Sequence, residues 1–543
     1  MSTPLQAFLH WQKETPDKTF LRQPVAGNWY TYSFQQAGEE ICKIASELKS
    51  SLPSRSKVAI LSKNCAHWLI ADLAIMMAGH ISVPIYPTLS AEGIRPLLEH
   101  GEVKLIFVGK LDNYESQKSG ISEEVRKISF PFYGPADGTP WNEIIGRATL
   151  LKNFVIPLEH ELATIMYSSG TTGTPKGVML THGAFGYVAE VVRENLQVKS
   201  SDRFFSYLPL SHIAERALME MVVLTAGSSV SFAESLDLFI ENLQHERPTI
   251  FGGVPRIYAK FQEGILTKLP QKKLTKLLSI PVIKNIVRRK IRKGLGLVDT
   301  RVVVSGAAPT PVALLEWFKK AGIEIAEIYG MTENTALSHA NYKKIKIGSV
   351  GQPWPGTETK LSDDGEILIR NKALMTGYYK DEETTKLVFT SDGYLRTGDK
   401  GKIDEDGFLT IDGRVKDQFK TDKAKFIAPA PIELKLLSNP DIAQVCVVGM
   451  GIPQPIALII LSNAGKHKPK GDIERSLEQS LASVNHSLES YERLTKAIVM
   501  HEEWTIENGM LTPSLKLKRN ELEKIFLPKY PEWYKAPGVV VWA

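Results

Sequence analysis

The residues best suited to phosphate chemistry lie in one loop rich in serine, threonine and glycine. An apolar run at residues 164–167 leads directly into this loop. Hydroxyl groups and glycine amides in one loop can surround phosphate oxygens without steric conflict, and a lysine adds positive charge. The candidate phosphate-binding residues are Ser168, Ser169, Gly170, Thr171, Thr172, Gly173, Thr174 and Lys176. Their types predict a loop that holds the phosphates of a nucleotide.

The loop does not match the two best-known nucleotide motifs. A Walker loop needs a lysine directly after its second glycine and a hydroxyl residue after that, whereas here Pro175 precedes Lys176 and Gly177 follows it. A dinucleotide fingerprint needs three spaced glycines, and the nearest candidate, 294–296, lacks the third. A surface hairpin rich in Ser and Thr is the alternative interpretation of the loop chemistry alone.

The complete string YSSGTTGTPKG at 167–177 resembles the signature of the adenylate-forming superfamily, which includes acyl-CoA synthetases, luciferases and adenylation domains. The string YLPLSHIAER at 207–216 is similar to a segment of the long-chain acyl-CoA synthetases within that superfamily, and FGGVPRIY at 251–258 resembles another of their elements. The resemblance covers nearly the whole chain and is strongest to bacterial long-chain fatty acid–CoA ligases. It implies that His212 lies near the substrate carboxylate and the phosphates.

Three further segments resemble the nucleotide site of the family. The strings VSGAAP at 304–309, YGMTE at 329–333 and RTGD at 396–399 match its motifs, and an arginine stands at 414. The resemblance implies that a small-residue turn packs on adenine and that Tyr329 stacks on the base. It also implies that Thr332 binds a phosphate oxygen and that Glu333 holds Mg²⁺. The implied adenine and ribose contacts are Gly306, Ala307, Ala308, Tyr329, Gly330, Asp399 and Arg414.

The C-terminal string NGMLTPSLKLKR at 508–519 resembles the catalytic-lysine motif of the family. Lys516 aligns with the catalytic lysine, and Lys518 is the competing candidate. The expected catalytic set is therefore Lys516, His212, Glu333 and Thr332. A basic strand end at the surface is the alternative interpretation of this segment.

Two positions depart from the family pattern. Gly413 stands where the residue before the arginine is usually Asp or Lys. Ala424 stands where the family usually has glycine, in a loop that lines the path of the attacking thiol. The added methyl group puts the thioester step in doubt and leaves adenylation untouched.

The elements that must position these residues follow an alternating pattern. Short apolar runs at 57–62, 81–88, 103–109, 228–233, 248–254, 300–306 and 322–330 alternate with helical patterns, as in α/β folds with parallel sheets. Glycine- and aspartate-bounded strands follow from about 345. We therefore predict a large α/β domain over 1–413, with a β-rich module at about 345–413, and a small α+β C-terminal domain over 414–543 that carries Lys516.

Composition limits the remaining possibilities. The chain has 543 residues, 23% of them charged, and its three cysteines form no metal-site or disulfide pattern. The longest apolar run, 68–78, is too short to span a bilayer and contains Asp72. No secretory leader is evident, so a cytoplasmic location is expected.

Segment 268–293 carries ten basic residues and no acidic one, against a net charge of +6 for the chain. Leucine, isoleucine and valine alternate with these charges, and Pro281 divides the segment into two short helices. A peripheral contact with the inner membrane surface is one interpretation, and a solvated helical pair is the other. Nucleic acid is not expected, because no nucleic-acid motif accompanies the charge.

The sequence thus predicts ATP-dependent activation of a medium-to-long-chain fatty acid to acyl-AMP, followed by transfer to CoA. One alternative is a fatty acyl-AMP ligase that loads a carrier protein, kept open by Ala424. Another is a non-catalytic descendant that binds acyl chains or nucleotide. The expected ligands are fatty acid, ATP, Mg²⁺ and CoA; chain length and oligomeric state are not readable from the sequence.

Overall fold

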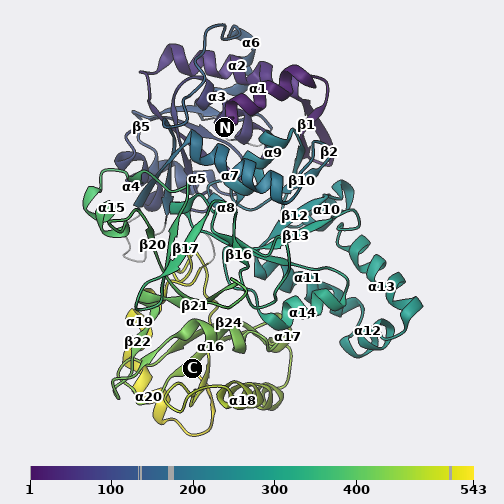
Figure 1. The fold of residues 1–543 in the computed structure, drawn as a ribbon, viewed down its shortest axis with the longest axis vertical. Helices are drawn as coiled ribbons and strands as arrows, with labels where there is room; N and C mark the ends of the chain where they lie inside the picture. The colour runs from purple at the N-terminus through teal and green to yellow at the C-terminus, as the bar shows by residue number, and fades with distance from the viewer. Residues whose placement is uncertain (1, 133, 135–136, 169–175, 513–515) are drawn as a thin grey trace.

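The computed structural model describes residues 2–132, 134, 137–168, 176–512 and 516–543. Its strands form two large mixed sheets and smaller sheets towards the C-terminus (Figure 1). The α/β class and the change to β-rich structure after residue 345 are confirmed. The sheets are mixed rather than purely parallel, since antiparallel strands close their edges.

The first large sheet holds nine strands within the described residues, and its central strands are parallel. In spatial order they are β16 (Gln352–Pro353), β15 (His339–Ala340), β14 (Ala326–Tyr329), β13 (Val302–Ser305), β12 (Ile250–Gly253), β10 (Arg203–Ser206), β11 (Ser229–Phe232), β1 (Thr19–Val25) and β2 (Asn28–Ser33). Parallel neighbours present their carboxyl ends at one edge, where α/β proteins bind ligands. The candidate residues that follow β10, β12, β13 and β14 therefore share that edge.

The second large sheet holds eight strands within the same described ranges. Their spatial order is β19 (Gly377–Tyr378), β9 (Lys176–Thr181), β8 (Leu162–Ser168), β4 (Ile81–Ile85), β3 (Lys57–Leu61), β5 (Val103–Val108), β6 (Arg126–Ser129) and β7 (Thr139–Pro140). Strands β8 and β9 form an antiparallel hairpin around the predicted phosphate loop.

Helices fill the space between and around the two sheets. The apolar run at 68–78 forms α3 (Ala66–Met77), in which every residue is buried, so the expected buried helix is confirmed. One hydrophobic cluster joins it to α1 (Pro4–Glu14), α2 (Phe34–Ser51), α7 (His182–Asn195) and α9 (Met221–Ala226). The helices flanking the sheets elsewhere are α4 (Ala91–His100), α5 (Tyr114–Gln117), α6 (Trp141–Arg147), α10 (Phe239–Glu246), α11 (Pro255–Lys268) and α14 (Val312–Lys320).

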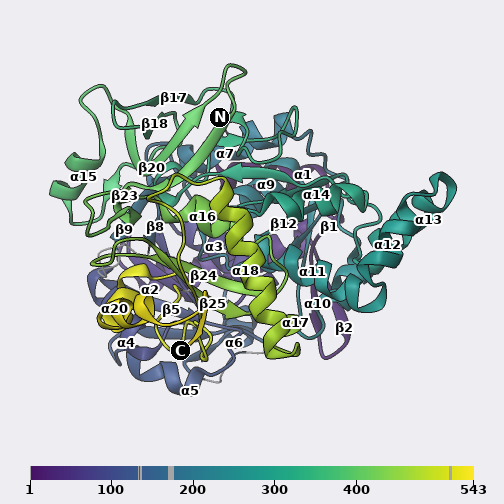
Figure 2. The ribbon, with the colours of Figure 1, turned by 90° about the horizontal axis from the view of Figure 1, so that it is seen from below.

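The basic segment forms a helical hairpin of α12 (Gln271–Leu278) and α13 (Pro281–Gly294). Proline at 281 occupies the first turn of α13, where its missing N–H is tolerated, so the predicted break is confirmed. The hairpin projects from the body of the molecule in both views (Figures 1 and 2).

The β-rich module is an antiparallel sheet with α15 (Glu382–Val388) beside it. Its strands are β17 (Glu358–Leu361), β18 (Glu366–Arg370), β20 (Leu395–Ile403) and β21 (Leu409–Arg414). Strand β21 ends at the position where the chain enters the C-terminal part.

The C-terminal part has hydrophobic clusters of its own on the two faces of one sheet. That sheet contains β24 (Ile442–Val448), β25 (Ile456–Leu461), β26 (Ala497–Val499) and β27 (Val540–Trp542), preceded by a small ribbon of β22 (Phe419–Lys420) and β23 (Phe426–Ile427). Its helices are α16 (Pro429–Leu436), α17 (Asn463–Lys466), α18 (Lys470–His486), α19 (Arg519–Phe526) and α20 (Tyr530–Lys535). In Figure 1 these elements lie together below the large sheets.

Candidate functional site

The two ends of the predicted phosphate loop lie next to each other. Ser168 at the end of β8 pairs with Lys176 at the start of β9. The ammonium of Lys176 lies 5.0 Å from the centroid of the Tyr378 ring, within range of a cation–π contact. The predicted residues Ser169, Gly170, Thr171, Thr172, Gly173 and Thr174 lie outside the described part of the chain.

Glu333 lies in a short helical turn, η3 (Thr332–Asn334), after the end of β14. The hydroxyl of Tyr378 donates to its Oε1 at 2.9 Å, and the amide of Met375 donates to its carbonyl at 2.8 Å. Burial and the nearby carboxylate raise the pKa of Tyr378, which therefore stays a donor. Glu333 is buried and Thr332 is half-buried beside it. Tyr378 thus joins Lys176 and Glu333, although no sequence motif marked it.

Tyr329, Asp399 and Arg414 form a chain of contacts. The Tyr329 hydroxyl donates to Asp399 Oδ2 at 2.7 Å, and Arg414 Nε lies 3.2 Å from Asp399 Oδ1. Antiparallel pairing of β20 with β21 sets Asp399 opposite Arg414. Thr397 Oγ1 accepts from the Asp399 amide at 3.1 Å and fixes the turn. Three residues predicted to hold one nucleotide are therefore in direct contact.

One glycine in each of the turns after β13 and β14 has no room for a side chain. A Cβ added to Gly306 would lie 2.7 Å from Ile328 Cγ1, and one on Gly330 would lie 2.4 Å from the Ala336 backbone. Ala307 adopts a positive φ of 66° and is half-buried, and Ala308 after it is exposed. Gly306 and Gly330 are therefore required for close packing within the protein, and the exposed Ala308 leaves the turn after β13 accessible.

His212 begins the short helix α8 (Ile213–Glu215). Its Nδ1 accepts from the Ala214 amide at 3.2 Å, which assigns the proton of the neutral ring to Nε2. Burial and the charge of Lys516 lower the pKa of His212 to about 3, so the ring is neutral at physiological pH. A neutral imidazole with Nε2–H exposed to the site can donate to a carboxylate or phosphate oxygen.

Lys516 reaches this site from the C-terminal part of the chain. Its amide donates to Thr512 Oγ1 at 3.0 Å, and Leu511 pairs with Leu517 in an isolated antiparallel bridge. The residue keeps contact with solvent, while surrounding protein and the Arg414 guanidinium lower the pKa of its ammonium; Asp399 and Glu333 oppose that shift. Lys516 therefore interacts electrostatically with residues that follow strands of the nine-stranded sheet, Glu333 and His212, and with the β-rich module.

The competing lysine occupies another position. Lys518 precedes the first residue of α19 and interacts electrostatically with Glu521 in the first turn of that helix. The geometry thus brings Lys516 rather than Lys518 to the cluster of predicted residues.

Both departures from the family pattern lie at positive φ. Gly413 has a φ of 123°, which disfavours any other residue, and an added Cβ would lie 3.3 Å from Ala430 Cβ. Ala424 has a φ of 59°, where an L-residue is strained and glycine is not. The two positions lie on either side of the segment formed by the short helical turn η4 (Val415–Asp417) and β22, between the β-rich module and the C-terminal sheet.

The described residues contain no group of three or more His, Cys, Asp or Glu side chains able to enclose a metal. Mg²⁺ does not need such a cage, because it is commonly bound by one or two carboxylates together with substrate phosphates. The buried Glu333 carboxylate, one oxygen of which is oriented by Tyr378, fits that role.

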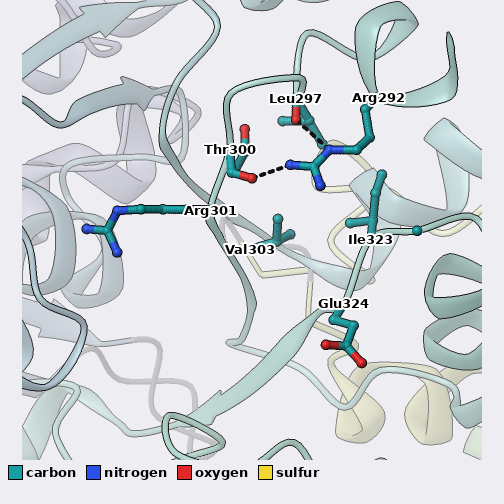
Figure 3. A pocket seen from close by; sticks show the side chains of 8 residues that line it. Arg292, Leu297, Thr300, Arg301, Val303, Ile323 and Glu324 are labelled. Carbon is teal, nitrogen blue, oxygen red and sulfur yellow. Dashed lines mark hydrogen bonds between the residues drawn. The ribbon is translucent and has the colours of Figure 1, made fainter. Parts of the chain in front are cut away.

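A separate cavity of about 190 Å³ lies between the end of α13 and the start of β13 (Figure 3). Arg292 donates there to the carbonyls of Thr300 and Leu297, and Arg301 is turned away and binds Asp202 at 2.7 Å. Both guanidinium groups are already paired, and the carboxylate of Glu324, which also lines the cavity, lies 3.5 Å from the Lys319 ammonium.

No helix in the described ranges combines the length and apolarity needed to cross a membrane.

Comparison with known proteins places this site in a family. The chain matches the model of the AMP-binding enzymes over residues 8–379 and that of the AMP-binding enzyme C-terminal domain over 416–536. It is 28% identical to long-chain-fatty-acid–CoA ligase FadD15 of Mycobacterium tuberculosis, covering 95% of this chain and 94% of that protein. It is 30% identical to the peroxisomal long chain acyl-CoA synthetase 6 of Arabidopsis thaliana, covering 94% and 82%.

Solved structures share the fold. The anthranilate CoA ligase AuaEII, in complex with anthranoyl-AMP, superposes with a TM-score of 0.81 at 21% identity over 97% of this chain and 98% of that one. The o-succinylbenzoate CoA synthetase of Bacillus subtilis, bound to its acyl-adenylate, gives a TM-score of 0.75 at 24% identity over 95% and 97%. Since the two family models together span most of the residues, the chain belongs to the AMP-binding enzyme family.

Proposed function

We propose that the protein is a fatty acid–CoA ligase. It activates a medium-to-long-chain fatty acid with ATP to an acyl-adenylate and then transfers the acyl group to CoA. The observation that carries the proposal is the convergence of Glu333, Asp399, Arg414, His212 and Lys516 from distant segments. The names of the full-length relatives, long-chain-fatty-acid–CoA ligase and long chain acyl-CoA synthetase, support the substrate class.

In the first step the substrate carboxylate attacks the α-phosphorus of ATP and pyrophosphate leaves. The barrier arises largely because two anions must meet, so positioned cations and hydrogen-bond donors lower it. In this proposal the Nε2–H of His212 orients the carboxylate and Lys516 neutralises charge that develops on the α-phosphate. The residues 168–176 hold the departing pyrophosphate, and Thr332 binds a phosphate oxygen.

The nucleoside is held by the remaining residues. Tyr329 and the 306–308 turn contact the base, and Asp399 accepts from the ribose hydroxyls with Arg414 beside it. Mg²⁺, held by Glu333 together with phosphate oxygens, would supply further positive charge when bound.

The second step requires the CoA thiol to reach the acyl carbon, displacing AMP. We place the domain boundary at 413/414, where Gly413 permits a backbone rotation that other residues resist. Rotation of the 414–543 domain would withdraw Lys516 and bring the 420–429 segment to the site.

Product analysis tests this function. Purified protein is incubated with ATP, Mg²⁺, CoA and a mixture of C2–C18 acids, and the products are identified by mass spectrometry. Acyl-CoA of long or medium chain length is the expected result. Acyl-AMP without acyl-CoA would instead support the carrier-protein alternative. Absence of pyrophosphate release with every acid would contradict acyl activation and support the non-catalytic alternative.

We further propose that the enzyme works in the cytoplasm, in peripheral contact with the inner membrane surface through 268–293. The turn between the two helices and the start of α13 expose apolar side chains, with Ile280 39%, Val282 76% and Ile286 53% exposed. None of its ten basic residues is paired with a carboxylate among the described ion pairs. Basic residues interleaved with exposed apolar ones suit an anionic lipid surface, which concentrates a poorly soluble acyl substrate.

Flotation with lipid vesicles tests the contact. The protein is expected to bind vesicles that contain 30% phosphatidylglycerol and to bind them less as the salt concentration rises. It should not bind vesicles of pure phosphatidylcholine. The variant K284E/R289E/K290E should lose binding, whereas the control K402E/K423E, with basic residues removed elsewhere, should keep it. Equal loss in both variants, or salt-independent binding, would contradict the proposal.

A further inference from the structure

Two buried side chains bind the backbone of the segment that leads to His212. Asn64 Nδ2 donates to the Leu208 carbonyl at 2.6 Å, and Asn64 Oδ1 accepts from the Leu210 amide at 3.1 Å. Glu215 Oε1 accepts from the Tyr207 amide at 3.2 Å. The segment is a loop without sheet partners of its own at these positions, so these contacts set its path.

The same two side chains are joined through Ser206. The Ser206 hydroxyl donates to Glu215 Oε1 at 2.7 Å, and Asn64 Nδ2 donates to Ser206 Oγ at 2.7 Å. All three residues are buried, and burial raises the pKa of Glu215 to about 8. Removing one member of a buried network leaves its partners unsatisfied and loosens what they hold.

The network bridges the two large sheets. Asn64 follows β3 of the eight-stranded sheet, Ser206 ends β10 of the nine-stranded sheet, and Glu215 ends α8. His212 is therefore tied to the sheet that carries the phosphate hairpin and to the sheet that carries Tyr329. The nucleotide contacts at Tyr329, Asp399 and Arg414 lie on other segments.

From this geometry we infer that Asn64 and Glu215 are positioning residues for His212. They hold Nε2–H at the place where the substrate carboxylate must meet the α-phosphate. This inference rests on the proposed function for its kinetic consequence. Loss of either side chain should reduce the rate of adenylate formation, because His212 is misplaced, and leave ATP binding almost unchanged, because its contacts lie elsewhere.

The variants N64A and E215A test the kinetic consequence. Each should lower kcat for acid-dependent pyrophosphate release at least tenfold, while KM for ATP stays within twofold of wild type. E215Q should restore most of kcat, since its amide carbonyl can still accept from Ser206 and Tyr207. The control N242A removes an equally buried asparagine, whose Oδ1 accepts from the Glu234 amide at 2.8 Å, and should lower stability without this loss of kcat.

Hydrogen–deuterium exchange of the 204–212 peptide supplies a readout that does not depend on turnover. The Tyr207 and Leu210 amides should exchange faster in N64A and E215A and at the wild-type rate in N242A. Unchanged exchange, or faster exchange with wild-type kcat, would overturn the positioning role. If wild-type protein releases no pyrophosphate, the proposed function fails, while the exchange comparison still decides whether the network holds the segment.

Discussion

At the scale of single residues, the site depends on charges that come from separate parts of the chain. Lys516 interacts electrostatically with Arg414, Asp399 and Glu333. The charge of Lys516 also lowers the pKa of His212. Two uncharged contacts orient groups of the site. The Tyr378 hydroxyl orients the Glu333 carboxylate, and the Ala214 amide orients the His212 ring through Nδ1. The roles proposed for these residues lead to two predictions.

Lys516→Ala should reduce acyl-adenylate formation by about 10²-fold or more, the usual scale for removing a group that stabilises transition-state charge. It should spare thioester formation from supplied acyl-adenylate, because Lys516 acts only in the first step. The two half-reactions are measured separately by pyrophosphate release and acyl-CoA formation. Lys518→Ala is the matched control. If Lys518→Ala shows the larger defect in adenylation, the assignment of Lys516 is wrong.

The rate of adenylate formation should decline at a lower alkaline pH than it would if Lys516 had the pKa of an ordinary lysine. The proposed role requires the protonated ammonium, and the pKa of Lys516 is lowered by surrounding protein and by Arg414. Activity is therefore present below that pKa and lost as pH rises through it, below the ordinary value of about 10.4. Lys516→Arg stays protonated, so its residual activity should lack this decline. A decline that persists in Lys516→Arg would assign it to another group.

At the scale of elements, local backbone conformation decides which residue each connection tolerates. The turn before β23 places Ala424 at a φ of 59°, and its amide donates to the Thr421 carbonyl at 3.0 Å. The end of β21 places Gly413 at 123°. The sequence departures that cast doubt on the thiol step are thus also positions of unusual backbone geometry.

Ala424→Gly should stabilise the protein by about 0.5–1 kcal/mol. It relieves the cost of a left-handed L-residue, offset in part by the greater entropy of glycine in the unfolded chain. It should also raise the rate of thioester formation without changing adenylation, if the methyl group narrows the path of the thiol. Urea unfolding and the separated half-reactions measure both effects. The control Ala428→Gly, at an ordinary φ of −93°, should lower the stability of the protein. A gain in stability equal to that of Ala424→Gly would show that relief of the left-handed backbone is not the cause.

At the scale of the whole molecule, one buried ion pair ties the segment after His212 to the eight-stranded sheet. Arg216 donates to Asp72 of α3 at 2.6 Å, to Thr164 of β8 at 2.7 Å and to Ser82 of β4 at 2.7 Å. Both charged side chains are fully inaccessible to solvent. The contacts span between 52 and 144 residues of sequence and hold the core between the sheets.

Arg216→Ala should lower the free energy of unfolding by about 3–5 kcal/mol, because it leaves the Asp72 charge buried without its partner. Urea unfolding measures the change. Lys524→Ala breaks an exposed pair with Glu521, at 2.8 Å, and should cost less than about 1 kcal/mol. Similar costs for the two variants would mean that the buried pair does not hold the core together as described.

Short strings of sequence were enough to predict the α/β class, the β-rich change near 345, the buried helix around 68–78 and the two short helices separated at Pro281. They also carry the resemblance to family motifs that named the candidate site. These features depend on neighbouring residues, whose periodicity and turn chemistry are legible along the chain.

Other features depended on contacts between residues far apart in sequence, and only the tertiary structure decided them. Tyr378 has no motif, yet the pairing of β19 with β9 sets it between Lys176 and Glu333. Asn64 meets Ser206 across 142 residues because two sheets end at the same place. Lys516 and Lys518 are chemically identical and two residues apart, so only their tertiary placement distinguishes which ammonium interacts with the site.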